Sequence, residues 1–149
     1  MPRPSALALI AGTALLVSAC AAPPSPAVSA TGAAPSAMVV ATGQGASAAF
    51  GAVRSALVRD GYRLASEDAR ARTLRTAPRE VDGVSVALTA TVQADGEVVL
   101  RGTYGRRAPQ PIRDEGRTGS AAQQAWAELG RVARLLPGRA RTDGAGSRP

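Results

Sequence analysis

The order of apolar and polar positions divides the chain into three stretches. A short apolar run covers residues 6–17, and residues 21–37 show no period. Alternating and helical patterns fill residues 38–136. Because only the third stretch can bury a continuous apolar face, we expect one small folded domain at residues 38–138.

The strongest pattern in that domain is a pair of alternating segments. Apolar residues occupy every second position from Val84 to Val92, and the alternation resumes from Val98 to Tyr104. Asp95-Gly96 lies between the two segments and is typical of a tight turn. The sequence therefore predicts a β-hairpin, with shorter strands at residues 38–42, 62–65 and 73–76.

A first helix is predicted over residues 46–60. Its apolar face comprises Ala46, Phe50, Val53 and Leu57, which recur at helical spacing. Gly61 follows at a position where a left-handed backbone commonly ends a helix.

A second helix is predicted over residues 121–136, with Ser120 as its N-cap. Its apolar face comprises Ala122, Trp126, Leu129, Ala133 and Leu136. The polar residues 105–119 before it are expected to form a mobile loop, and residues 139–149 after it a disordered tail. The expected order is strand, helix, three strands, helix. This order predicts an α+β two-layer sandwich, an antiparallel sheet covered by two helices.

The N-terminus carries a separate signal. Arg3 precedes the apolar run, and the run ends in Val17-Ser18-Ala19-Cys20. The run is shorter than the roughly 20 residues that a membrane-spanning helix needs. This segment resembles the lipobox of bacterial lipoproteins, in which an aliphatic residue and two small residues precede a Cys.

The resemblance implies that residues 1–19 are a signal peptide cleaved between Ala19 and Cys20. Cys20 would then carry diacylglycerol and an amide-linked acyl chain such as palmitate, anchoring the protein to a membrane that faces the periplasm. Ala21 follows the Cys, and in the enteric sorting pattern this residue implies the outer membrane. Residues 20–37 would comprise the lipidated Cys and a disordered tether rich in Pro, Ala, Ser and Gly. The element order is also similar to the helix-grip-like domains of the lipoprotein component of the β-barrel assembly machinery, a likeness of fold alone.

Composition adds a formal net charge of +7, with every basic residue an Arg. High genomic G+C content explains such a bias, and so does an anionic partner such as an acidic protein surface or anionic lipid. The candidate partner-binding residues are Arg70, Arg72, Arg75, Arg79, Arg101, Arg106 and Arg107; solvated surface charge is the alternative reading. An exported protein would rarely meet nucleic acid, so no nucleic acid partner is expected.

The residues that most enzymes need are missing from the sequence. There is no His and no Lys, and Cys20 is the sole Cys. A Ser–His or Ser–Lys nucleophile and a His metal site are therefore excluded. The adjacent or alternating carboxylates, such as Glu67 and Asp68, fall in predicted loops or turns. We expect no catalysis, cofactor or metal.

The sequence thus predicts a membrane-anchored, non-catalytic interaction or accessory module of the cell envelope. The alternative is a lipoprotein that binds a small ligand or lipid in a pocket between sheet and helices. A filled core with an exposed basic surface favours the first interpretation, and an internal apolar cavity favours the second.

Overall fold

The computed structural model describes residues 34, 36–115 and 118–143. The predicted signal peptide, Cys20 and most of the predicted tether lie outside the described residues. Among the residues described, no helix has the length and apolar character needed to cross a bilayer.

In this described part, the chain forms two helices and one antiparallel sheet of eight strands, which confirms the α+β class. The elements are β1 (Met38–Ala41), α1 (Ala46–Arg59), β2 (Leu64–Asp68), β3 (Thr73–Thr76), β4 (Arg79–Val81), β5 (Val84–Val92), β6 (Glu97–Tyr104), β7 (Gln110–Pro111), α2 (Ala121–Leu135) and β8 (Arg139–Thr142).

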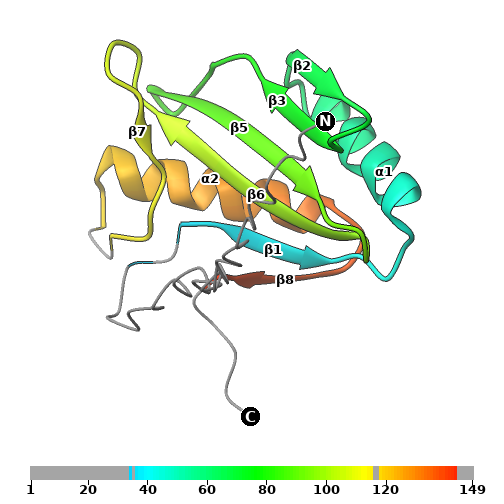
Figure 1. Ribbon diagram of the computed structural model, residues 1–149. Coiled ribbons are helices and arrows are strands. Elements are labelled where there is room, and N and C mark those ends of the chain that lie inside the picture. Colours follow the sequence, from blue (N-terminus) through cyan, green and yellow to red (C-terminus); the bar gives the residue numbers. More distant parts are fainter. Residues whose placement is uncertain (1–33, 35, 116–117, 144–149) are drawn as a thin grey trace, which may run out of the picture. The chain divides into compact units, whose positions relative to one another are not determined.

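The sheet places the first and last strands of the domain side by side. Its order is β2-β3-β5-β6-β1-β8, with β4 paired to β5 and β7 paired to β6. Strand β1 therefore lies inside the sheet, between β6 and β8, although it comes first in the chain (Figure 1). The edges of the six-strand order are β2 and β8.

The predicted hairpin is confirmed as β5 and β6. Val86 lies opposite Tyr104 and Val92 opposite Val98, so the buried apolar residues of both strands share one face. The turn closes at Gly96, whose φ of 83° is left-handed and whose amide donates to the Gln93 carbonyl at 3.1 Å. Local alternation and turn chemistry were sufficient to define this unit.

The core lies between the apolar face of the sheet and the two helices. Figure 1 views the sheet from its other side, with α1 and α2 behind it. The predicted apolar face of the second helix is buried throughout: Ala122, Trp126, Leu129, Ala133 and Leu136. Ser120 caps this helix, as predicted, by accepting a hydrogen bond from the Gln123 amide at 3.1 Å. In α1, Val53 and Leu57 are buried and Phe50 packs against the core while partly exposed.

The expected order of six elements is incomplete, because β4, β7 and β8 were not predicted. Strand β8 occupies residues assigned to a disordered tail, and β7 occupies part of the expected loop at residues 105–119. Ile112, next to β7, is fully buried, and its amide donates to the Gly102 carbonyl at 2.9 Å. One apolar side chain thus attaches a polar segment to the sheet.

Candidate functional site

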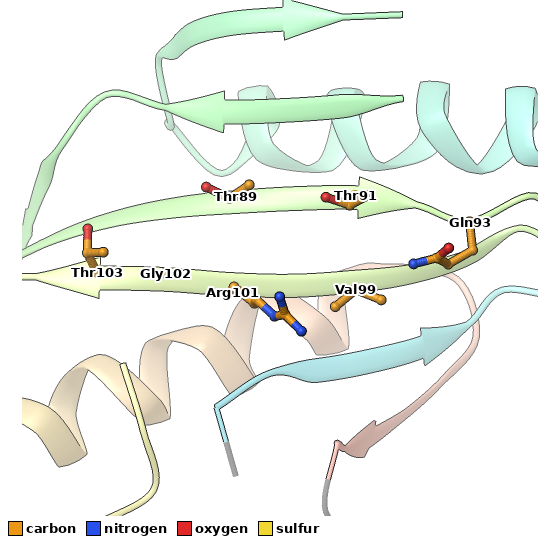
Figure 2. A pocket seen from close by; sticks show the side chains of 7 residues that line it. All are labelled: Thr89, Thr91, Gln93, Val99, Arg101, Gly102 and Thr103. Atoms are coloured by element: carbon orange, nitrogen blue, oxygen red, sulfur yellow. The ribbon is translucent and has the colours of Figure 1, made fainter. Parts of the chain in front are cut away.

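The outer face of the sheet, opposite the helices, carries a shallow hollow of about 340 Å³. Figure 2 shows that it is formed by the central hairpin. Its lining residues are Thr89, Thr91, Gln93, Val99, Arg101, Gly102 and Thr103. We call the whole side of the sheet that lies opposite the helices the outer face.

The chemistry of the outer face follows from strand alternation. In β5 and β6 the positions between the buried apolar residues are Thr, Ala, Val and Arg, and these side chains point away from the helices. Gly102 contributes backbone alone. A Cβ at Gly102 would lie 2.7 Å from the Ile112 Cδ1 atom and 2.8 Å from the Ala87 carbonyl oxygen. The packing of Ile112 on the inner side therefore requires a glycine there.

Cross-strand register places arginines on both sides of the hollow. Arg75 of β3 lies opposite Thr89, and Thr89 lies opposite Arg101, so the three residues form one row. Both arginine side chains are exposed. Residues directly opposite each other in an antiparallel sheet point to the same face, so both guanidinium groups belong to the outer face.

A second row extends the outer face toward the β8 edge. Thr91 lies opposite Val99, Val99 opposite Val39, and Val39 opposite Arg141 of β8. Val39 is buried at 8% exposure, whereas Arg141 is exposed. The Arg141 guanidinium contacts the Glu97 carboxylate at 2.9 Å. The outer face therefore combines an aliphatic centre with cationic margins.

The structure does not gather the seven arginines predicted from sequence into one surface. Arg75 and Arg101 share the outer face. Arg70 and Arg72 lie in the turn between β2 and β3, beside the β5–β6 turn, because the Val92 amide donates to the Arg72 carbonyl at 2.9 Å. Strand β3 is not an edge strand, because β2 lies beyond it.

The remaining three arginines are elsewhere. Arg107 is exposed in the segment after β6, and its neighbour Arg106 contacts the Glu80 carboxylate at 2.9 Å. This hydrogen bond lowers the pKa of Glu80. Arg79 points to the inner side, where its guanidinium lies 4.9 Å from the centre of the Tyr62 ring and donates to the Asp60 carbonyl at 2.6 Å. Its partners are therefore intramolecular.

Sequence reasoning missed a polar cluster at the inner side of the sheet. Tyr62 donates from its hydroxyl to Glu128 at 2.6 Å, and Arg131 donates from Nε to the same carboxylate at 2.6 Å. Arg131 Nη1 also donates to Asp60 at 2.8 Å. We call Asp60, Tyr62, Arg79, Glu128 and Arg131 the polar cluster. The spacing of Glu128 and Arg131, three residues apart on a helix, was its only signal in the sequence.

The shifted pKa values within the polar cluster favour ionised carboxylates and a protonated tyrosine. Hydrogen bonds from Arg131 lower the pKa of both Glu128 and Asp60, against the opposing effect of burial. Burial, reinforced by the hydrogen bond to Glu128, raises the pKa of the Tyr62 hydroxyl. Tyr62 therefore stays protonated and donates, while both carboxylates stay ionised. These groups hold one another, so the cluster joins the end of α1 to α2.

Two observations limit the chemistry available. In the described ranges, no group of three or more carboxylate, His or Cys side chains is placed to hold a metal ion. The hydroxyl groups of Thr89, Thr91 and Thr103 have no His or Lys to activate them, because the sequence contains neither. The outer face offers hydrogen-bonding groups, aliphatic contact and positive charge, which are features that a binding surface uses.

No protein-family model matches the chain, and no curated protein matches it.

Proposed function

We propose that this protein is a membrane-anchored envelope lipoprotein that acts as a non-catalytic interaction module. Its docking surface is the outer face. The observation that supports the proposal is the contrast between the two sides of the sheet. Buried side chains fill the inner side, while the outer side presents a hollow flanked by Arg75 and Arg101.

In this proposal the domain is a two-layer sandwich, with both helices on one side so that the other is left for a partner. Arg75 and Arg101, which flank the hollow, have no ion-pair partner among the described residues. Charges on a binding surface steer an oppositely charged partner and set its orientation. An acidic protein surface is therefore the partner that this face fits.

The anchor in this proposal is Cys20. It rests on the resemblance of residues 17–20 to a lipobox, because Cys20 lies outside the described residues. Two or more acyl chains anchor a protein stably. The attached domain would then search for its partner near the membrane surface.

A ligand-binding lipoprotein is the second candidate function. It requires an unfilled volume between sheet and helices. The residues there, among them Val40, Leu74, Leu100 and Leu129, are fully buried and form one continuous cluster. This packing favours the docking function over an internal pocket.

The docking function is tested by photocrosslinking in whole cells. A photoreactive amino acid replaces Thr103, exposed on the outer face, or Val58, which is 50% exposed on α1. We expect the probe at Thr103 to capture one envelope protein and the probe at Val58 to capture none. Equal capture at both positions would reject the outer face as the docking surface. A lipid released from the purified chain by organic extraction would favour the ligand-binding function.

Charge reversal gives an independent test of the same surface. We expect Arg101→Glu to reduce capture by the Thr103 probe at least about fivefold, because a cation that faces an acidic partner becomes a like charge. The matched control is Arg59→Glu, which makes the same charge change at an exposed position on α1. Equal losses in both variants would show that net charge matters and the outer face does not.

A further inference from the structure

Strand β8 leaves one side of its backbone unpaired. The Asp143 amide donates to the Ala37 carbonyl at 3.0 Å, and these residues continue the register in which Val39 lies opposite Arg141. Hydrogen-bonded and non-hydrogen-bonded pairs alternate in an antiparallel ladder. Arg139 and Arg141 therefore bond to β1, whereas the N–H and C=O groups of Ala140 and Thr142 point away from it.

Those outward groups have no partner strand in the described part of the chain, because β8 is the last strand of the sheet order. The β8 edge is short and carries two arginines, but two other features that block strand addition are missing from it. Its four residues contain no proline, and its pairing with β1 runs without a register shift. Arg139, Ala140 and Arg141 are exposed.

The opposite edge is blocked in several ways. Strand β2 shows a register shift between Leu64 and Ser66 in its pairing with β3. Glu67 of β2 contacts Arg54 of α1 at 3.0 Å, so a helix side chain lies against this edge. A bulge in an edge strand and a helix side chain lying against it both hinder pairing with a further strand. The two edges differ, and β8 is the one suited to receive a strand.

Charge indicates which strand fits. Arg139 has no ion pair among the described residues, and Arg141 shares the carboxylate of Glu97. A second copy of β8 would place arginines against arginines, and like charges directly opposite each other destabilise a strand pair. An extended segment with carboxylates at alternate positions would instead place them opposite Arg139 and Arg141.

We propose that the β8 edge binds an acidic extended segment of the partner protein by antiparallel strand addition. The segment bonds to the outward N–H and C=O groups of Ala140 and Thr142, and its carboxylates lie opposite Arg139 and Arg141. The inference rests on the proposed function, because it states how the partner of that function attaches. Main-chain bonds supply affinity in this mode, and side-chain chemistry supplies specificity.

The probe for the test is a peptide matched to this register, acetyl-Thr-Val-Glu-Val-Glu-amide. In antiparallel pairing its valines lie opposite Thr142 and Ala140, and its glutamates lie opposite Arg141 and Arg139. Binding of the fluorescently labelled peptide to the full chain in detergent is measured by anisotropy. We expect saturable binding that weakens with added salt.

Two methylated peptides separate strand addition from charge attraction. N-methylation of both valines removes the N–H groups that would donate to β8. N-methylation of both glutamates removes N–H groups that point away from β8. We expect the first change to weaken binding about tenfold or more and the second to have little effect, because only the first removes two hydrogen bonds. Equal binding of both methylated peptides would overturn the proposal.

Variants of the chain test the same geometry from the protein side. Ala140→Pro removes the outward N–H, and proline is tolerated on edge strands when its nitrogen faces solvent. We expect a loss of peptide binding of about fivefold with an unchanged thermal unfolding midpoint. Arg139→Glu should also weaken binding, while Arg134→Glu on α2 should not. Peptide binding that is unaffected by Ala140→Pro would overturn the proposal.

These experiments distinguish failure of strand addition at β8 from failure of the proposed docking function. If the Thr103 probe captures a protein in cells but the peptide does not bind, strand addition fails and docking stands. If the peptide binds in the expected register and no protein is captured, the edge is competent and the docking function fails. Formation of dimers that Ala140→Pro abolishes, without peptide binding, would assign the edge to a second copy and overturn the proposal.

Discussion

At the scale of single residues, Arg131 is the residue on which the polar cluster depends. It donates to Glu128 and to Asp60, whose side chains are 4% and 16% exposed. The cost of taking two carboxylates out of water is offset by this guanidinium and by the Tyr62 hydroxyl. Removing the cation leaves both carboxylates without their main partner.

We therefore expect Arg131→Met to lower the free energy of unfolding by about 2 kcal/mol. This lies below the range for fully buried pairs, because the Arg131 side chain is 39% exposed. Urea denaturation measures the change. The control is Arg134→Met, an exposed arginine on the same helix, for which the change should stay within about 0.5 kcal/mol. Equal effects would contradict a special role for Arg131.

The same cluster predicts a dependence of stability on acid pH. The pKa values of Glu128 and Asp60 are lowered from their ordinary values of 4.5 and 3.8. Groups with lowered pKa values stabilise the fold fully above their ordinary values, and this stabilisation is lost as pH falls through their folded-state values. We expect Glu128→Gln to cost about 2 kcal/mol at pH 7 and progressively less below pH 4.5. A difference between variant and wild type that stays constant down to pH 2 would contradict this account.

At the scale of elements, two loops approach each other closely. The β5–β6 turn meets the segment between β1 and α1, and a Cβ built on Gly96 would lie 1.8 Å from the Gln44 carbonyl oxygen. Thr42 adds a hydrogen bond from its hydroxyl to the Gly96 carbonyl at 2.9 Å. The turn is therefore held by its neighbour as well as by its own backbone.

A matched pair of glycines tests this approach. Gly96 and Gly83 both have a φ of 83°, but a Cβ at Gly83 would meet nothing within 4 Å. We expect Gly83→Ala to cost about 1 kcal/mol through the left-handed backbone alone. Gly96→Ala should cost at least about 2 kcal/mol more, because the loops must separate. Thermal or urea unfolding measures both, and equal costs would refute the steric role.

The elements also show what could be predicted from the sequence. The β5–β6 hairpin and both helices are specified by local periodicity, because each buries a long apolar stripe. Strands β4, β7 and β8 are short and polar, and they exist because β5, β6 and β1 offer backbone partners. These pairings depend on strands from other parts of the sequence, so the local pattern of apolar residues does not reveal them. The outer face was only partly predictable for the same reason: Arg75 and Arg101 become neighbours through the register of β3, β5 and β6.

At the scale of the whole molecule, the proposed anchor and the described domain have separate roles. In the proposed function, the domain would supply the binding surface and the residues before it the attachment. Cys20 is the single residue on which attachment depends in this proposal, because acyl chains on its sulfur and amine provide the membrane affinity.

We expect Cys20→Ala to remove the protein from the membrane fraction without changing the unfolding midpoint of the domain. Metabolic labelling with radioactive palmitate and cell fractionation measure the outcome. Ser18→Thr, which keeps a small hydroxyl residue before the Cys, is the control and should remain in the membrane fraction. Continued membrane association and labelling of the Cys20→Ala variant would contradict lipidation at this residue.

The interior position of β1 has a mechanical consequence. A pull transmitted along the chain from the residues before Met38 reaches β1 first. That strand is paired along its full length to β6 on one side and β8 on the other. Tension along a strand that is clamped between two antiparallel neighbours loads both ladders in shear, so their hydrogen bonds share the force instead of opening one after another. In the proposed anchored protein, tension would therefore enter the domain through a strand that is paired on both sides.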